Sequence, residues 1–224
     1  MNYLTHIDSE LMLLLNFDGG SMMDGLWWFI SGKFTWIPLY LFLIWLLYKG
    51  SQTGEVTSAF RRNNATDWRQ FILLLVITVL VVVISDRISS GLIKPWAMRP
   101  RPAQPDSGIS EWIHTVRGYR GGHYGFVSSH AANTWGIVLW FLLLLRRWRT
   151  EHPTDRVTRR FIRHLGVLLI LFSLLNCYSR IYLGVHYPGD ILGGLAVGTI
   201  AALLAFYVLL PLAKRRINGK KAEE

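Results

Sequence analysis

Five apolar stretches, each long enough to cross a lipid bilayer as a helix, constrain the fold of this chain more than any other feature. A transmembrane helix needs about 20 predominantly apolar residues. The stretches cover residues 26–48, 68–90, 125–145, 164–183 and 191–213. Composition agrees, because 51% of the 224 residues are hydrophobic and only 17% are charged, against about a quarter in globular domains. The sequence predicts an all-α integral membrane protein, a helical bundle of five or six transmembrane helices.

The N-terminal region leaves the number of spans open. Residues 7–17, IDSELMLLLNF, are typical of an amphipathic helix that lies at the membrane interface. A sixth, shorter insertion there is the alternative, and it would move the N-terminus to the other side. We therefore divide the chain into an N-terminal interfacial segment (1–25), a transmembrane domain (26–213) and a basic cytoplasmic tail (214–224).

The distribution of basic residues predicts the orientation. The net charge of +10 alone would permit a nucleic-acid partner. Most of the 24 lysines and arginines, however, fall in the connections after the first and third spans and in the C-terminal tail. With five spans these regions share one side, which the positive-inside rule assigns to the cytoplasm. We expect no nucleic-acid partner and an N-terminus on the outside.

Three polar segments emerge together on the outer side under this topology. They follow the second span, begin the third span and connect the fourth span to the fifth. Their sequences are KPWAMRPRP with Lys94 and Arg101, FVSSHAAN with Ser128, Ser129 and His130, and SRIYLGVHYPGD with Arg180, His186 and Asp190. This convergence follows from the topology and predicts one site at the outer membrane face.

The basic and hydroxyl side chains of these segments suit a phosphate dianion. Lys94, Arg101 and Arg180 are cations, and arginine offers paired hydrogen bonds to phosphate oxygens. Ser128 and Ser129 stand where the third helix begins, and the free N–H groups of a helix N-terminus attract anions. The surrounding prolines predict that the segment after the second span is stiff and extended rather than helical.

Two histidines supply the remaining chemistry. Pro188 suits the first position of the fifth helix, so Asp190 falls in its first turn, within reach of His186. A carboxylate beside a histidine fixes its tautomer and stabilises the positive ring that forms when the other nitrogen reacts. His130 makes an acid–nucleophile pair with His186 plausible.

The order and spacing of these residues resemble the three-part signature of the type 2 phosphatidic acid phosphatases (PAP2), a superfamily that also includes vanadium haloperoxidases. The matching parts are Lys94-x6-Arg101-Pro102, Ser128-x-His130 and Ser179-Arg180-x5-His186-x3-Asp190. The resemblance implies a phosphatase that needs no metal or other cofactor. It assigns His186 as the nucleophile, Asp190 as its orienting partner and His130 as the acid. Lys94, Arg101, Ser128, Arg180 and the backbone N–H of Ser129 would hold the phosphoryl oxygens.

Several positions stay open at this level. Ser129 stands where the family usually has glycine, and a second Arg-Pro pair allows Arg99 to share the role of Arg101. Asp86 and Arg87 either pair with each other at the interface or support the site. His114 and His123 are expected to be solvated loop residues. The single cysteine, Cys177, excludes an intramolecular disulfide and a multi-cysteine metal site.

A site at the outer interface meets lipid headgroups, which predicts a phosphorylated lipid as the substrate. The resemblance implies undecaprenyl diphosphate, lipid A phosphate or phosphatidylglycerol phosphate, hydrolysed in the periplasm by a protein of the bacterial inner membrane. Alternatives are a phosphotransferase that uses the same phosphohistidine, a vanadate-dependent peroxidase, and a non-enzymatic transporter or scaffold. The oligomeric state is left open.

Overall fold

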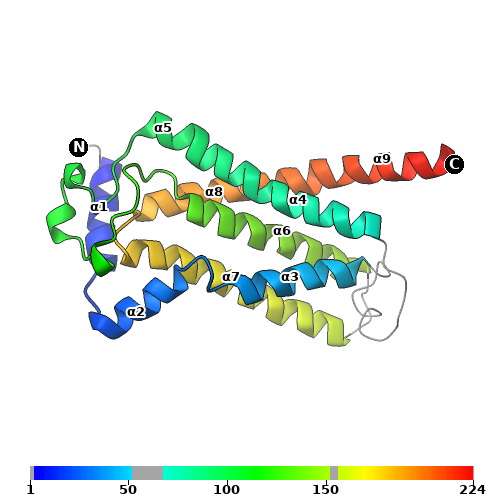
Figure 1. Cartoon of the computed structure of the whole chain (residues 1–224), viewed down its shortest axis with the longest axis horizontal. Coiled ribbons are helices and arrows are strands. Elements are labelled where there is room, and N and C mark those ends of the chain that lie inside the picture. Colours follow the sequence, from blue (N-terminus) through cyan, green and yellow to red (C-terminus); the bar gives the residue numbers. More distant parts are fainter. Residues whose placement is uncertain (1–2, 52–67, 152–155, 224) are drawn as a thin grey trace.

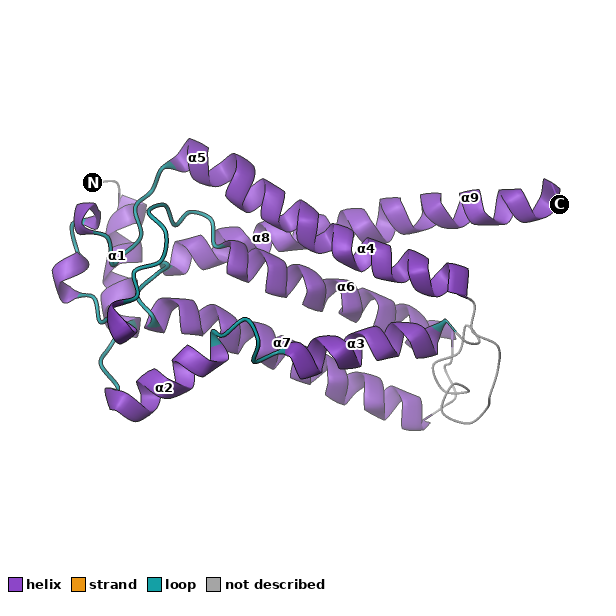
Figure 2. Ribbon diagram, in the orientation of Figure 1, coloured by secondary structure: helices purple, strands orange, loops and turns teal. Residues whose placement is uncertain are grey.

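A bundle of lengthwise helices forms most of the molecule (Figure 1). The computed structural model describes residues 3–51, 68–151 and 156–223. Within these residues the chain forms helices and loops and no β-strand (Figure 2). The lengthwise helices are α3 (Ile37–Gly50), α4 (Trp68–Asp86), α6 (Ser129–Glu151), α7 (Arg156–Tyr182) and α8 (Pro188–Leu204).

Three of the helical segments are long and apolar enough to cross a membrane. They cover Trp68–Ala97, Arg156–Tyr182 and Pro188–Arg216, which have 30, 27 and 29 residues. The first continues α4 through a π-helical segment, η2 (Arg87–Ile93), into α5 (Lys94–Ala97). The last continues α8 through η6 (Ala205–Leu209) into α9 (Leu210–Glu223). The predicted all-helical membrane fold is confirmed.

The first apolar stretch is not one helix, contrary to the prediction for residues 26–48. It is divided between α2 (Gly20–Ile30) and α3, with a break at residues 31–36. The break has local causes: Trp36 Nε1 donates to the carbonyl of Ile30 at 2.7 Å, and a proline lies within the first two positions of α3. Because these groups turn the chain, Ser31 is buried and faces the end of α7.

The second stretch extends further than the prediction, which placed Lys94 in an extended loop. The helix passes through Pro95 and ends only at Met98, whose φ of 44° is left-handed. In the π-helical turn before Lys94 the hydrogen bonds join residues five apart instead of four. The helix therefore continues although Pro95 has no N–H to donate. Lys94 is therefore held on a rigid helix instead of a loop.

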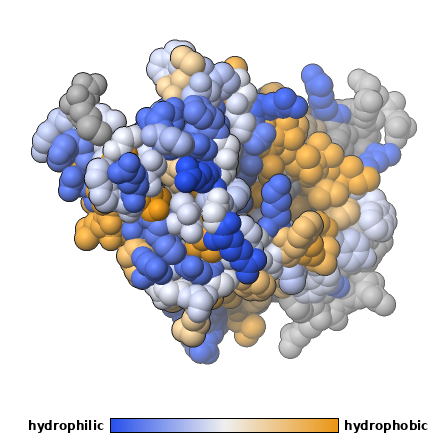
Figure 3. Space-filling view, turned by 60° about the vertical axis from the view of Figure 1, so that its left-hand side comes forward, coloured by the Kyte–Doolittle hydropathy of each residue, from blue (hydrophilic) through white to orange (hydrophobic). Residues whose placement is uncertain are grey.

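Two short helices and a long connection cover one end of the bundle. Helix α1 (Tyr3–Leu15) lies across this end, as Figure 1 shows, and α2 follows it. The connection between α5 and α6 contains only three short 3-10 turns, η3 (Pro105–Ser107), η4 (Ser110–Trp112) and η5 (Val116–Gly118). Figure 3 shows this end as mostly hydrophilic, with hydrophobic side chains on the flank behind it.

The predicted amphipathic helix near the N-terminus exists as α1 and has two faces. Asp8 and Met12 are buried against the bundle, whereas Leu4, Leu11 and Leu14 are exposed. An exposed leucine face beside a buried one suits a helix at the membrane interface.

Glycines bring α6 and α8 into close contact. A side chain at Gly198 would lie 2.5 Å from the carbonyl oxygen of Ala132, and one at Gly194 would clash with the carbonyl oxygen of Ser128. Small residues four apart allow membrane helices to approach backbone to backbone. The N-termini of both helices consequently lie side by side, and Ser128 N–H donates to the carbonyl of Asp190 at 2.9 Å.

The opposite end of the bundle holds the last residues of α3 and α6, the beginnings of α4 and α7, and the C-terminus (Figure 1). The predicted basic connections begin or end here. Arg61 and Arg62, which contributed to the predicted orientation, lie outside the described residues. The three polar segments and the basic connections thus occupy opposite ends of one membrane bundle.

Candidate functional site

All eight residues predicted to form the site meet at the end covered by α1. Lys94 comes from α5, Arg180 from the last turn of α7, and Asp190 from the first turn of α8. Ser129 and His130 open α6, and Ser128 precedes them. Arg101 and His186 come from the connections. The convergence that the topology predicted is therefore present in the structure.

The His186–Asp190 pair is built by the start of α8. Asp190 is the third residue of that helix, and its Oδ2 accepts the Tyr187 N–H at 3.1 Å, which caps the helix N-terminus. The same oxygen lies 3.2 Å from His186 Nδ1, and both side chains are almost completely buried. A carboxylate only accepts, so Nδ1 carries the proton and the lone pair of Nε2 is available.

Positive charge surrounds His186. Burial lowers the pKa of its ring well below the ordinary value, and the charges of Arg101, Arg180 and Lys94 lower it further. A depressed pKa keeps the imidazole neutral at neutral pH. A neutral imidazole that is oriented by a carboxylate is a competent nucleophile.

A glycine-rich turn packs closely against the side chain of Arg101. Arg101 Nε donates to the carbonyl of Tyr124 at 3.1 Å, and a side chain at Gly121 would lie 2.5 Å from its guanidinium. A side chain at Gly125 would lie 2.8 Å from Asp190 Oδ2. Burial, followed by the charge of Arg180, lowers the pKa of Arg101. Two buried arginines whose positive charges act on each other are suited to bind an anion.

Arg180 keeps a free donor. One terminal nitrogen donates to the hydroxyl of Ser31, and the guanidinium also interacts with Tyr119. Its Nε is buried and has no hydrogen-bond partner among the described residues. An unsatisfied buried donor costs about 1–3 kcal/mol. A phosphoryl oxygen would satisfy it.

The N-terminus of α6 adds neutral donors and a link to Lys94. Ser128 Oγ accepts the N–H of Ala131 at 3.3 Å, as expected of an N-cap residue. Ser129, which stands where the family usually has glycine, accepts a hydrogen bond from Lys94 Nζ at 3.0 Å. The serine at this position thus orients a cation of the site.

His130 follows in the first turn of α6. Its carbonyl accepts the hydroxyl of Thr134 at 2.8 Å. Its ring makes no hydrogen bond within the part of the chain that the structure describes, which leaves both nitrogens available to a substrate oxygen. His130 also lies close enough to influence the pKa of His186.

Arg99 occupies a different position from the one considered in the sequence. Arg99 does not share the position of Arg101: it pairs with Asp190 Oδ1 at 3.1 Å and with Asp8 Oδ2 at 2.6 Å. Asp86 accepts the hydroxyl of Ser90 at 3.3 Å, and Arg87 is exposed. No ion pair joins Asp86 to Arg87 among the described residues. The charge of Asp86 acts on Lys94, which agrees with the alternative that Asp86 supports the site.

Sequence reasoning missed several residues at the site. Asp8 lies far from the motifs and carried no signal of its own. Ser31 lies in the Ser31-Gly32-Lys33 interruption of the first apolar stretch, and that interruption was the available signal. The glycines near Arg101 form a short run, GGHYG, which the spacing of the motifs did not include.

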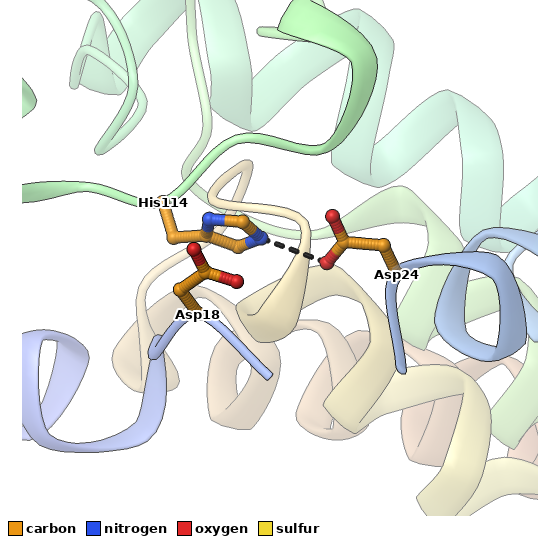
Figure 4. A group of neighbouring side chains, drawn as sticks. All are labelled: Asp18, Asp24 and His114. Carbon is orange, nitrogen blue, oxygen red and sulfur yellow. Dashed lines mark hydrogen bonds and ion pairs between the residues drawn. The ribbon is translucent and has the colours of Figure 1, made fainter. Parts of the chain in front are cut away.

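One group of potential metal ligands lies among the described residues: Asp18, Asp24 and His114, whose ligand atoms are within 4.8 Å of one another (Figure 4). His114 Nε2 pairs with Asp24 Oδ1 at 2.8 Å, and Tyr182 donates to the same oxygen at 2.8 Å. These bonds join α2 to the long connection and to α7. The prediction that His114 is solvated is wrong, whereas His123 is exposed.

Known proteins share both the sequence and the fold. The profile of the PAP2 superfamily matches residues 64–213. A lipid A 4'-phosphatase from Porphyromonas gingivalis is 31% identical over 98% of this chain and 80% of its own length. One from Bacteroides thetaiotaomicron is 27% identical over 96% and 82%. The crystal structure of a transmembrane PAP2-type phosphatidylglycerolphosphate phosphatase from Bacillus subtilis superimposes with a TM-score of 0.60 at 18% identity, covering 96% of this chain and 88% of that one. The chain belongs to the PAP2 superfamily.

Proposed function

We propose that this membrane phosphatase removes a phosphate from the sugar headgroup of a lipid A-type saccharolipid, through a phosphohistidine formed on His186. The observation that carries the mechanism is a buried, neutral imidazole held by Asp190 and surrounded by Lys94, Arg101 and Arg180. The choice of lipid is supported by two lipid A 4'-phosphatases that are similar over nearly the whole chain.

The residues divide the reaction into two steps. The three cations, the Ser128 hydroxyl and the Ser129 N–H bind the phosphoryl oxygens and stabilise the charge that they carry in the transition state. His130 enters this step protonated, with its charge stabilised by the bound phosphate dianion. His186 Nε2 attacks phosphorus while the bond to the lipid oxygen breaks, and His130 gives that oxygen its proton. Asp190 stabilises the positive ring that results. His130 then takes a proton from water, which attacks phosphorus and releases inorganic phosphate and free His186.

The position of the site suits a lipid in the outer leaflet of the bacterial inner membrane. The cations around His186 lie at the end of the bundle that α1 covers, and the basic connections lie at the other end. Under the positive-inside rule the basic end faces the cytoplasm, so the site faces the periplasm. A reporter fused after Glu224 should give a cytoplasmic signal; a periplasmic signal would reverse this orientation.

Phosphate release from a panel of lipids tests the proposal. Detergent-purified protein is given a lipid A-type bisphosphate, undecaprenyl diphosphate and phosphatidylglycerol phosphate, each with and without EDTA. The expected result is metal-independent release that is fastest from the saccharolipid, and inhibition by vanadate. Faster release from the isoprenoid diphosphate would reassign the substrate. Transfer of labelled phosphate to an acceptor would identify a phosphotransferase, and no release from any lipid would favour a binding protein.

A further inference from the structure

The N-terminal helix reaches the catalytic centre through one side chain. Asp8 in the second turn of α1 is buried, and its Oδ1 accepts the N–H of Gly189 at 2.7 Å. Its Oδ2 pairs with Arg99 at 2.6 Å. A side chain at Gly189 would lie 2.6 Å from Asp8 Oδ2. The first turn of α8 is thus shaped to receive a carboxylate from α1.

Arg99 connects this carboxylate to the nucleophile. The same terminal nitrogen of Arg99 that contacts Asp8 lies 3.1 Å from Asp190 Oδ1, while Asp190 Oδ2 contacts His186. The guanidinium lies 3.8 Å from the centre of the Tyr187 ring, which fixes its plane. Four charged or titratable side chains therefore form a continuous chain: Asp8, Arg99, Asp190 and His186.

We propose that Asp8 and Arg99 are positioning residues, through which helix α1 holds Asp190 against His186. The proposal rests on the proposed role of His186 as the nucleophile. Arg99 occupies the Asp190 oxygen that faces away from the histidine, so the carboxylate cannot rotate. Arg99 favours the ionised form of Asp190. Asp8 balances the charge of Arg99, so that the net charge of the three groups stays negative beside the imidazolium that forms during the reaction.

Two other contacts hold α1 in this place and separate the anchoring of the helix from the role of Asp8. Met12 is completely buried among side chains of the long connection, α7 and α8. Asn16 Nδ2 donates to the carbonyl of Tyr182 at 2.8 Å, and its Oδ1 accepts the N–H of His114 at 2.7 Å. Because these contacts remain when Asp8 is changed, an Asp8 variant should keep α1 docked.

Other charged side chains also face His186, and the variants of Asp8 and Arg99 described below leave them unchanged. They come from every element around the ring: Asp190, Arg101, Lys94, Arg180 and His130. Removing the negative charge of Asp8 should lower the pKa of His186, and removing the positive charge of Arg99 should raise it. A loss of packing alone would not move the pKa in opposite directions.

The test compares Asp8→Asn, Arg99→Gln, their double variant and Glu10→Gln, which removes the same charge from an exposed position of the same helix. We expect kcat to fall about 10-fold for Asp8→Asn and about 10- to 100-fold for Arg99→Gln, with KM unchanged. In the pH profile of kcat/KM, the acid limb should move to lower pH for Asp8→Asn and to higher pH for Arg99→Gln. In the double variant, Asp8→Asn should lower kcat little beyond the effect of Arg99→Gln alone. Glu10→Gln should behave as the wild type.

A second measurement follows the His186 ring without turnover. The ring is titrated by NMR in 15N-histidine-labelled protein, with the His186→Ala variant to assign its signal. Opposite shifts of the pKa in the two single variants are expected, even if the wild type acts on none of the lipids offered. The proposal is overturned if Asp8→Asn matches Glu10→Gln. It is also overturned if Arg99→Gln raises KM at constant kcat, which would make Arg99 a phosphate ligand.

Discussion

Three histidine–aspartate pairs lie among the described residues at this end of the bundle, and the two less exposed pairs have different surroundings. His186 and Asp190 are buried, with exposed side-chain fractions of 2% and 0%, and cations crowd the histidine. His114 and Asp24 are partly exposed, at 17% and 25%, and Asp18 lies beside them (Figure 4). Tyr182 donates a hydrogen bond to Asp24. A histidine–aspartate pair alone therefore does not distinguish the proposed nucleophile. Burial and the surrounding positive charge both lower the pKa of the His186 ring, and the same charge would attract a phosphate.

The largest difference between the pairs should appear on removing each histidine. His186→Ala should abolish turnover, a loss of at least about 10⁴-fold, because no other group supplies the attacking lone pair. His114→Ala should keep most of the activity and lower the melting temperature, since it breaks a link between α2 and the long connection. Initial rates and thermal melts of both variants in one detergent check this. Equal losses of activity would remove the distinction.

Removing the cations around His186 should give the next largest effect. Arg101→Ala or Arg180→Ala should lower kcat/KM by about 10²- to 10³-fold, because each removes charge that stabilises the phosphoryl oxygens. The pKa of His186 is lowered in part by these cations, so their loss should raise it. The acid limb of kcat/KM should then move to higher pH. A loss of rate with an unchanged limb would mean that these arginines do not act on His186.

The hydroxyl of Ser129 should matter less. Ser129→Gly restores the residue usual in the family and removes the hydrogen bond from Lys94 at 3.0 Å. The N–H donor of the helix N-terminus remains, so kcat should change by only about 2- to 5-fold. Ser129→Ala, which also lacks the hydroxyl, is the matched variant. If only the glycine variant lost activity, backbone freedom at residue 129 would be the important property.

The smallest effect on activity should come from the carboxylate of the second pair. Asp24→Asn weakens the contacts with His114 and Tyr182 and should cost about 1–2 kcal/mol of stability. Rates at low temperature should match the wild type, whereas the melting temperature should fall. A change in the pH dependence of kcat/KM would show that this pair communicates with the active site.

The contrast between the two pairs also shows how far the sequence leads. The motif spacing and the alternation of spans were sufficient to predict that Lys94, Ser128, His186 and the other motif residues lie at one end. Each helix that crosses the membrane carries the chain to the opposite side, so every second connection lies on the same side. The spacing from Lys94 selected Arg101 as the phosphate ligand, but it left open whether Arg99 shares that role. The structure separates them by their partners: carboxylates for Arg99, and a backbone carbonyl for Arg101.

Other differences arose where side chains overrode a regular pattern. The apolar stretch resumes after Ser31-Gly32-Lys33, so it suggested one continuous helix. The hydrogen bond of Trp36 and the proline at the start of α3 break the helix there. The proline at 95 suggested a loop, but a preceding π-helical turn accommodates it and carries Lys94 on a helix. Asp8 reaches the site only through tertiary contacts, so no local sequence pattern could predict its place there.

The central claim is that His186 carries the phosphoryl group. Wild-type protein is mixed with a lipid labelled in its phosphate, quenched in alkali within the first turnover, digested and sequenced by mass spectrometry. An alkali-stable, acid-labile phosphate on His186 is the predicted result, absent from the His186→Ala variant and still formed in His114→Ala. Label on His130, or phosphate release with no labelled histidine in any variant, would contradict it.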